Sequence, residues 1–383
     1  MIRSLLVIVL VSALAGAVAP GQGLTRAKEI WEKIGHLFAP PADLKDDLGT
    51  FHPVLQFEDG RAVRTAAGWD ERRQELLRKW HGLLGPWPPP LEKPYAQEQW
   101  RDTVEGFARR RIELEIAPGR KTAVYLLAPE GKGPFPAVLD VFYYPEDGAG
   151  IKEDRRRQND FGYQLVKRGF VSLCLGQNPT APRPEADLYY PAWDKAQVQP
   201  LSYLAYVAAN AHTWLAQRPE VDPKRIGVVG HSYGGKWALF AGALSEKFAA
   251  VCVSDPGIVF DESRPNVNYW EPWYLGYVPG PDFRPRGVLS EKYPRVGPYK
   301  TMIEKGYDLH ELHALIAPRP FFVAGGSEDP PARWKALNHA VAVNRLLGYE
   351  NRVGMSSRPA HTITPDANEQ ICLFFEYFLK ELQ

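Results

Sequence analysis

The sequence predicts an α/β protein built on a doubly wound, mostly parallel sheet. From about residue 106 onward, short apolar runs alternate with helical segments, and the later runs are almost continuously apolar. Runs of that kind are expected where helices cover both faces of a parallel sheet. Helices also fit between the runs, as SYLAYVAANAHTWLAQ does before RIGVVGHS and KWALFAGAL does after it.

The expected strands are RRIELEI, TAVYLLAP, FPAVLDVFYY, FVSLCLG, RIGVVGHS, FAAVCVSDPG, RPFFVAGG and NRVGMSS. Residues 18–105 contain helix candidates but no strand rhythm, so we expect an amino-terminal helical extension of a main domain at residues 106–383. An aromatic stretch at about residues 258–317 interrupts the alternation. Long irregular insertions are more often functional than idle, so we expect a lid-like insertion there.

The first residues, MIRSLLVIVLVSALAGAVAPGQG, have the order of a secretory signal peptide: a basic residue, an apolar run and then small residues. The apolar run from Leu5 to Leu14 is short for a membrane span. We expect residues 1–17 to be removed, leaving a secreted or periplasmic protein without stable membrane association. An uncleaved amino-terminal anchor is the alternative.

The overall charge and the cysteines indicate which partners and which disulfides to expect. The chain has 383 residues, with 46 Lys and Arg against 45 Asp and Glu, so its overall charge gives no sign of a nucleic-acid partner. Cys174, Cys252 and Cys372 lie in apolar segments with no pairing pattern, so we expect buried free thiols. The oligomeric state is not predicted.

The pentapeptide Gly230-His231-Ser232-Tyr233-Gly234 matches G-x-S-x-G. This pattern is typical of a nucleophile elbow, in which a serine lies on a strained turn between a strand and a helix. Glycines have no Cβ and allow the strand and the helix to approach closely. We therefore predict that Ser232 is a nucleophile, and that His231, at the variable position, has a packing role.

A serine nucleophile needs a base that takes its proton and a carboxylate that orients the base. In this fold class the chain order is serine, acid, histidine. Asp329, with Glu328 beside it, follows the apolar run RPFFVAGG, and His361 lies in a loop before the terminal amphipathic helix. We predict a catalytic triad of Ser232, Asp329 and His361.

The oxyanion hole is expected to use the backbone N–H of Tyr233 and one N–H from the loop VFYYPEDG, that of Tyr143 or Tyr144. His310 and His313 form an H-x-x-H pair, which is one residue short of the zincin spacing and lacks a third ligand. We expect a capping or surface role for these two histidines. No metal site and no cofactor are predicted.

The segments VDPKRIGVVGHSYGGKWALFAGAL and APRPFFVAGGSEDP resemble the α/β-hydrolase superfamily, and within it the bacterial dienelactone-hydrolase-like and carbohydrate esterases. Acetyl xylan esterases and glucuronoyl esterases belong to that group. Glucuronoyl esterases typically show G-C-S-R-x-G-K, of which this chain keeps the lysine, Lys236, but has His231 and Tyr233 in place of the cysteine and arginine. The resemblance also keeps Glu271 open as the acid, because some of those enzymes take it from an earlier strand.

These features predict an exported serine esterase that acts on a small-molecule or polysaccharide ester through an acyl-Ser232 intermediate. Lys236, one helical turn after the serine, and Trp270 and Trp273 in the insertion are the predicted sugar-binding residues. A peptidase of the prolyl oligopeptidase type is the second hypothesis, although fewer than 100 residues precede the sheet where that family usually has a propeller. A catalytically inactive ligand-binding module on the same fold is the third.

Overall fold

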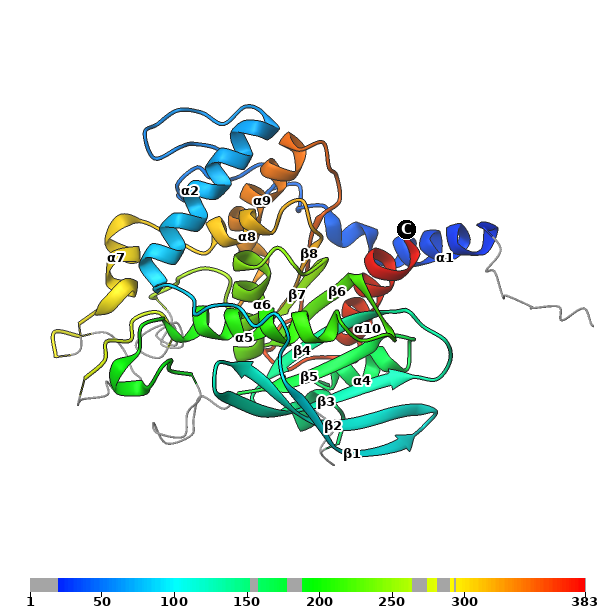
Figure 1. The fold of residues 1–383 in the computed structure, drawn as a ribbon. Helices are drawn as coiled ribbons and strands as arrows, with labels where there is room; N and C mark the ends of the chain where they lie inside the picture. The colour runs from blue at the N-terminus through cyan, green and yellow to red at the C-terminus, as the bar shows by residue number, and fades with distance from the viewer. Residues whose placement is uncertain are drawn as a thin grey trace, which may run out of the picture.

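A sheet of nine strands runs through the part of the chain that the computed structural model describes, namely residues 20–151, 158–177, 188–263, 274–280, 290–292 and 294–382 (Figure 1). The strand order is β1-β2-β3-β5-β4-β6-β7-β8-β9. The strands are β1 (Ala96–Val104), β2 (Phe107–Ala117), β3 (Arg120–Pro129), β4 (Phe135–Phe142), β5 (Val171–Gly176), β6 (Val221–His231), β7 (Ala250–Ser254), β8 (Phe321–Gly325) and β9 (Val353–Ser357). β1, β2, β3 and β5 pair antiparallel, and all remaining neighbours pair parallel.

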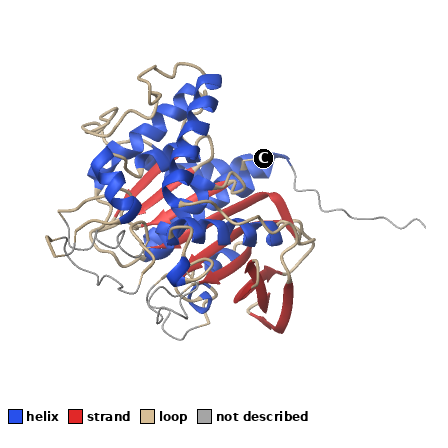
Figure 2. Ribbon diagram, turned by 60° about the vertical axis from the view of Figure 1, so that its left-hand side comes forward, coloured by secondary structure: helices blue, strands red, loops and turns tan. Residues whose placement is uncertain are grey.

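Helices cover both faces of this sheet (Figure 2). One face carries α2 (Ala66–Leu84), α5 (Pro200–Leu215), α6 (Tyr233–Leu244), α8 (His310–Ile316) and α9 (Trp334–Leu346). The other carries α1 (Pro20–Ile34), α3 (Pro145–Gly148), α4 (Phe161–Val166) and α10 (Pro365–Phe375). The helix α7 (Gly297–Lys305) belongs to the predicted insertion.

The central strands are apolar throughout because both of their faces are buried. In β7, Val251 and Val253 pack into the core on one side, whereas Ala250 and Cys252 pack into the core on the other. Side chains alternate between the faces of a strand, so a continuous apolar run supplies both cores at once. The predicted doubly wound α/β fold is confirmed, and all eight predicted runs overlap strands β2 to β9.

The amino-terminal segment differs from the prediction at its end. It contains α1 and α2 as expected, and Thr65 caps α2 by accepting a hydrogen bond from the Gly68 N–H at 3.0 Å. However, β1 falls within residues 18–105, where no strand was expected, and it pairs with β2 as the edge of the sheet. The first strand therefore belongs to the sheet, although its residues are mostly polar and exposed.

Several predictions concern residues outside the described ranges. The proposed signal peptide at residues 1–17, the alternative acid Glu271 and the two insertion tryptophans, Trp270 and Trp273, all lie there. The three cysteines are described, and all are buried and free, as predicted.

Candidate active site

Ser232 lies at the turn between β6 and α6, where the sequence predicts a change from strand to helix. Its backbone has φ 54° and ψ −115°, a conformation that residues with a Cβ rarely adopt. A Cβ on Gly230 would lie 2.2 Å from the Gly234 carbonyl oxygen, and a Cβ on Gly234 would lie 2.0 Å from that of Val141. The two glycines therefore allow the close approach that this turn requires.

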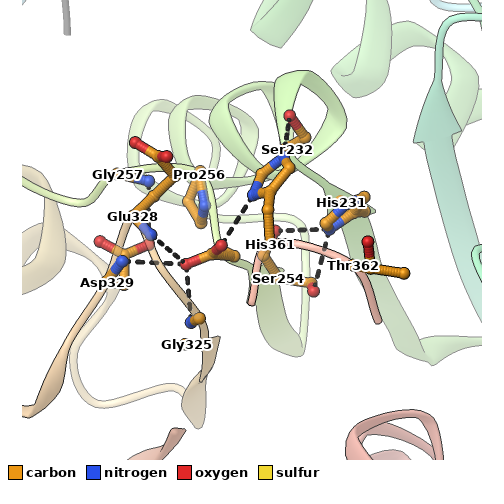
Figure 3. Close-up of polar contacts among 12 residues, drawn as sticks. His231, Ser232, Ser254, Pro256, Gly257, Gly325, Glu328, Asp329, His361 and Thr362 are labelled. Carbon is orange, nitrogen blue, oxygen red and sulfur yellow. Dashed lines mark hydrogen bonds and ion pairs between the residues drawn. The ribbon is translucent and has the colours of Figure 1, made fainter. Parts of the chain in front are cut away.

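His361 lies in the loop between β9 and α10 and contacts the serine (Figure 3). Its Nε2 is 2.9 Å from Ser232 Oγ, and its Nδ1 is 2.7 Å from Asp255 Oδ2. When the Nδ1–H donates to a carboxylate, Nε2 is left as the acceptor for the serine hydroxyl. The three side chains thus form a continuous hydrogen-bonded chain from carboxylate to hydroxyl.

The carboxylate that contacts His361 is Asp255, so the prediction that Asp329 fills this place is wrong. Asp255 directly follows β7, whereas Asp329 follows β8. The backbone N–H groups of Gly326, Glu328 and Asp329 donate to Asp255 Oδ1 at 2.6, 3.1 and 2.9 Å. Burial opposes ionisation of Asp255, but the hydrogen bonds from His361 and from the Asp329 N–H outweigh it and hold the pKa of Asp255 below its usual value.

Asp329 instead holds the loop that carries Asp255. Its carboxylate accepts hydrogen bonds from the backbone N–H groups of Gly257 at 2.8 Å and Ile258 at 2.6 Å. The side chain is fully buried, and burial together with the nearby charge of Asp255 raises the pKa of Asp329 to about 6. Asp329 therefore supports the position of Asp255 through the backbone of the following residues.

The sequence around Asp255 could have identified it as a candidate acid. Asp255 stands in CVSDPG at the end of the strand after the nucleophile, which is the same context that led to Asp329 in GGSEDPP. Both aspartates end an apolar run, and both come before His361 in the chain. The two sequence contexts are equivalent, so only the course of the loops in three dimensions shows which aspartate contacts His361.

Two further buried side chains, His231 and Arg358, contact His361 or the loop that carries it. His231 Nδ1 lies 3.1 Å from the carbonyl and hydroxyl oxygens of Ser254 (Figure 3), and its ring packs against His361 with centroids 4.7 Å apart. Burial, together with the nearby His361, lowers the pKa of His231 to about 3, so this ring is neutral. The Arg358 guanidinium donates to the carbonyl oxygens of His361 and Thr362 at 2.8 and 2.9 Å. This arginine therefore ties the loop that carries His361.

A pocket of about 250 Å³ lies beside Ser232. Tyrosines from three separate segments line it: Tyr143 after β4, Tyr233 at the start of α6, and Tyr274 from the predicted insertion. Glu328 and Lys236 add charged groups to the wall. The pocket thus combines aromatic surface with groups that can bind hydroxyls.

The predicted binding residue Lys236 lies in this pocket and is only 8% exposed. Its ammonium donates a hydrogen bond to the Pro256 carbonyl oxygen. Burial lowers the pKa of Lys236 to about 8, against the raising effect of Asp329, Glu328 and Asp255 nearby. Lys236 therefore lies close to the nucleophile and does not extend into solvent.

The two tyrosines predicted as alternatives for the second oxyanion donor differ in their surroundings. Tyr143 lines the pocket, whereas Tyr144 is 43% exposed and stands at the start of α3, where its carbonyl accepts the Asp147 N–H. Tyr233 is the first residue of α6, and the first N–H groups of a helix have no intrahelical acceptor. Tyr233 and Tyr143 both line the pocket beside Ser232, and their N–H groups stay the expected oxyanion donors.

His310 and His313 are fully buried in α8, so the expected capping or surface role is wrong. The His310 Nε2–H donates to the His52 carbonyl at 2.8 Å, and its ring packs against His339 with centroids 4.7 Å apart. This helix is covered by the amino-terminal segment and α9, which the sequence could not place. Among the described residues, no group of three or more His, Cys, Asp or Glu side chains is arranged to hold a metal ion.

Comparisons with known proteins point to hydrolases. Residues 208–361 match the model of the prolyl oligopeptidase family. The chain is 24% identical over 343 residues to 4-O-methyl-glucuronoyl methylesterase 1 of Wolfiporia cocos (strain MD-104), which covers 84% of this chain and 79% of that protein. It is 28% identical over 168 residues to the carbohydrate esterase MZ0003 from an unknown prokaryotic organism, covering 40% of this chain and 35% of that protein.

Two solved structures share this fold over most of their length. The glucuronoyl esterase from Solibacter usitatus superposes with a TM-score of 0.66 at 17% identity, covering 86% of this chain and 97% of that chain. The glucuronoyl esterase from Teredinibacter turnerae T7901 superposes with a TM-score of 0.63 at 18% identity, covering 92% of this chain and 99% of that chain.

Proposed function

We propose that this chain, an α/β hydrolase that resembles the carbohydrate esterases, is a serine esterase that hydrolyses a carboxylic ester of a carbohydrate. The observation that carries the proposal is the position of His361, which bridges Ser232 Oγ at 2.9 Å and Asp255 Oδ2 at 2.7 Å. A hydroxyl on a strained turn, a histidine acceptor and an ionised carboxylate are the groups that acyl transfer to serine requires.

In the proposed reaction, His361 Nε2 takes the Ser232 proton as Oγ attacks the ester carbonyl carbon. The carbonyl oxygen becomes an oxyanion, which the N–H groups of Tyr233 and Tyr143 stabilise. The tetrahedral intermediate collapses, the C–O bond to the alcohol breaks, and the His361 imidazolium protonates the departing alkoxide. Water, activated by the same histidine, then cleaves the acyl-Ser232 ester and releases the acid. Asp255 holds the Nδ1–H throughout and stabilises the transient positive charge on the imidazolium.

The carbohydrate assignment is supported by the relatives and by the pocket. A methylesterase and a solved structure that cover 84% and 86% of the chain are both named for glucuronoyl esters. Lys236 and Glu328 place a donor and an acceptor beside the nucleophile, where they can bind sugar hydroxyls. The predicted sugar-stacking role of Trp270 and Trp273 remains part of the proposal.

A substrate panel tests this function. Purified protein is assayed on methyl esters of glucuronate, on acetylated xylan and on a short aryl acetate, with Ser232→Ala as the control for each. We expect hydrolysis of a sugar ester with a higher kcat/KM than that of the aryl acetate. Equal kcat/KM values on sugar and aryl esters would leave only an esterase without carbohydrate preference.

A peptidase is the second candidate because of the match to the prolyl oligopeptidase family. A chromogenic proline amide added to the panel distinguishes the two functions. An esterase is expected to leave the amide intact under conditions where the ester is consumed. Amide cleavage that disappears in Ser232→Ala would favour the peptidase.

We also propose that the protein is exported, on the basis of the signal-peptide pattern in residues 1–17. No helix in the described part of the chain is long and apolar enough to cross a membrane. Amino-terminal sequencing of protein recovered from the expressing cells tests this proposal. Export predicts a chain that starts after Ala17, and a retained Met1 would contradict it.

A further inference from the structure

Two exposed aromatic side chains lie at or beside β1, one of the two edge strands of the sheet, away from the active-site pocket. Tyr95, immediately before β1, is 48% exposed, and Trp100 within β1 is 43% exposed. Neither ring belongs to any of the hydrophobic clusters of the described residues. Their conformations are therefore not explained by core packing.

The strand register places both rings on the same face. Tyr95 lies opposite Glu115, whose N–H donates to the Tyr95 carbonyl at 2.8 Å, and Trp100 lies opposite Arg111. Glu115 and Arg111 are four residues apart in β2 and therefore point to the same side of the sheet. A bulge in β1 between Glu98 and Trp100 is what brings Trp100 to this side.

Contacts across the strands agree with the register. The Lys121 ammonium lies 4.2 Å from the centre of the Tyr95 ring, and the Arg109 guanidinium lies 5.2 Å from that of Trp100. Four residue steps along a strand separate the two rings by about 14 Å. Each ring thus contacts one cation, and each still has a large exposed surface.

The polar groups between and beside the rings balance in charge. Arg109 pairs with Asp102 at 2.6 Å, and Lys121 pairs with Glu113 at 3.3 Å. A face with paired charges has little attraction for a polyanion such as nucleic acid. It does offer donors and acceptors for hydroxyl groups beside flat aromatic rings, which suits a neutral ligand that is rich in hydroxyls.

One end of this face lies at the edge of the sheet where Ser232 is located. Val124 of β3 lies opposite Leu175 near the carboxyl end of β5, so the start of β3 lies at the edge where Ser232 follows β6. Tyr95 is at that end of β1, and Trp100 is farther from it. In Figure 1, β1 lies at the lower margin of the molecule. Five strand spacings separate β1 from β6, or roughly 24 Å across the sheet.

We infer that the exposed face of β1 and β2, centred on Tyr95 and Trp100, is a second carbohydrate-binding surface that holds a polysaccharide chain while an ester on the same polymer reaches Ser232. This inference rests on the proposed carbohydrate function. Binding at a second point raises the effective concentration of the ester at the active site without a new contact to the reacting group. A small soluble ester gains nothing from this surface.

A binding assay with insoluble xylan and insoluble cellulose tests the inference. The full-length protein is compared with the double variant Tyr95→Ala/Trp100→Ala and with Tyr349→Ala. Tyr349 is also 40% exposed but follows α9, outside the face of β1 and β2, and serves as the matched control. We expect wild type and Tyr349→Ala to be retained on at least one of the two polysaccharides, and the retained fraction of the double variant to fall at least tenfold.

Two further readouts separate binding from folding and from catalysis. The melting temperature of the double variant is expected to equal that of wild type, since neither ring is in a core cluster. Its kcat/KM on a soluble aryl acetate is expected to be unchanged, while its rate on a polymeric ester falls.

Equal retention of wild type and the double variant, or no retention of wild type on either polysaccharide, would overturn the inference. A wild-type dimer that becomes a monomer in the double variant, measured by light scattering, would assign this face to self-association and overturn it too. Retention does not require turnover. If the protein hydrolyses sugar esters but binds neither polysaccharide, only this inference is refuted. If it hydrolyses no ester, the proposed function is refuted.

Discussion

Replacing Asp255 with asparagine tests whether the acid of the triad is Asp255, which the structure indicates, or Asp329, which the sequence predicts. The Asp255→Asn side chain has the same shape, but its amide group can donate to His361 Nδ1 and so favours the tautomer with the proton on Nε2. That tautomer cannot accept the Ser232 proton. Loss of the correct tautomer costs on the order of 10⁴ in kcat in a serine triad, which corresponds to about 5.4 kcal/mol of activation free energy.

Asp329→Asn is the matched control because the two carboxylates lie on neighbouring loops. Asp329 accepts the N–H groups of Gly257 and Ile258, and an amide group can keep only part of that hydrogen bonding. Losing one charge-assisted hydrogen bond costs about 1.5–3 kcal/mol of stability. We expect a lower free energy of unfolding and a kcat reduced by no more than about tenfold, since Asp255 keeps its contact with His361.

The assay is the kcat of both variants on a short aryl acetate, with urea denaturation of each protein as the stability readout. A loss near 10⁴ in Asp255→Asn, next to a modest loss in Asp329→Asn, supports the geometry described above. The reverse ranking would show that His361 is oriented by Asp329 during catalysis, and the assignment of Asp255 would be wrong.

Three other predictions follow from single contacts. Gly234→Ala would place a Cβ 2.0 Å from the Val141 carbonyl oxygen, so we expect the free energy of unfolding to fall by at least about 3 kcal/mol, measured in urea. Burial raises the pKa of Asp140 from 3.8 to about 8, so the folded protein keeps a proton that the unfolded chain releases, and the contribution of this carboxyl to stability is lost as pH rises from about 4 to about 8. Asp140→Asn lacks this decline, and its stability relative to wild type is expected to increase between pH 5 and pH 8; a constant difference would contradict the buried neutral carboxyl. Lys236→Met is expected to lower kcat/KM for a sugar ester about tenfold or more, with the aryl acetate much less affected, and equal losses would exclude a sugar-binding role.

The fold was predictable where the sequence repeats a strong local signal. Strands β5, β7 and β8 are buried on both faces, and their continuous apolar runs can be recognised without knowledge of their neighbours. β1 was missed because AQEQWRDTV has neither an apolar run nor apolar alternation. Its backbone pairing with β2 stabilises it, and pairing between segments leaves no mark in the composition of an exposed edge strand.

The site was predictable where one residue carries the signal and ambiguous where two residues share it. Ser232 and His361 were both predicted from sequence, and the structure places Ser232 Oγ 2.9 Å from His361 Nε2. The acid was misassigned because Asp255 and Asp329 each follow an apolar strand at the correct place in the chain order. His310 is a related case, because the segments that bury it are distant in sequence and have no local pattern that reveals the contact.

Labelling with a fluorophosphonate probe, located by peptide mass spectrometry, tests the central claim most directly. A serine activated by His361 and Asp255 is expected to form a single covalent adduct at Ser232. The adduct should be absent in Ser232→Ala, and ester turnover in that variant should fall by several orders of magnitude. Labelling at another residue, or Ser232→Ala turnover equal to that of wild type, would contradict the account.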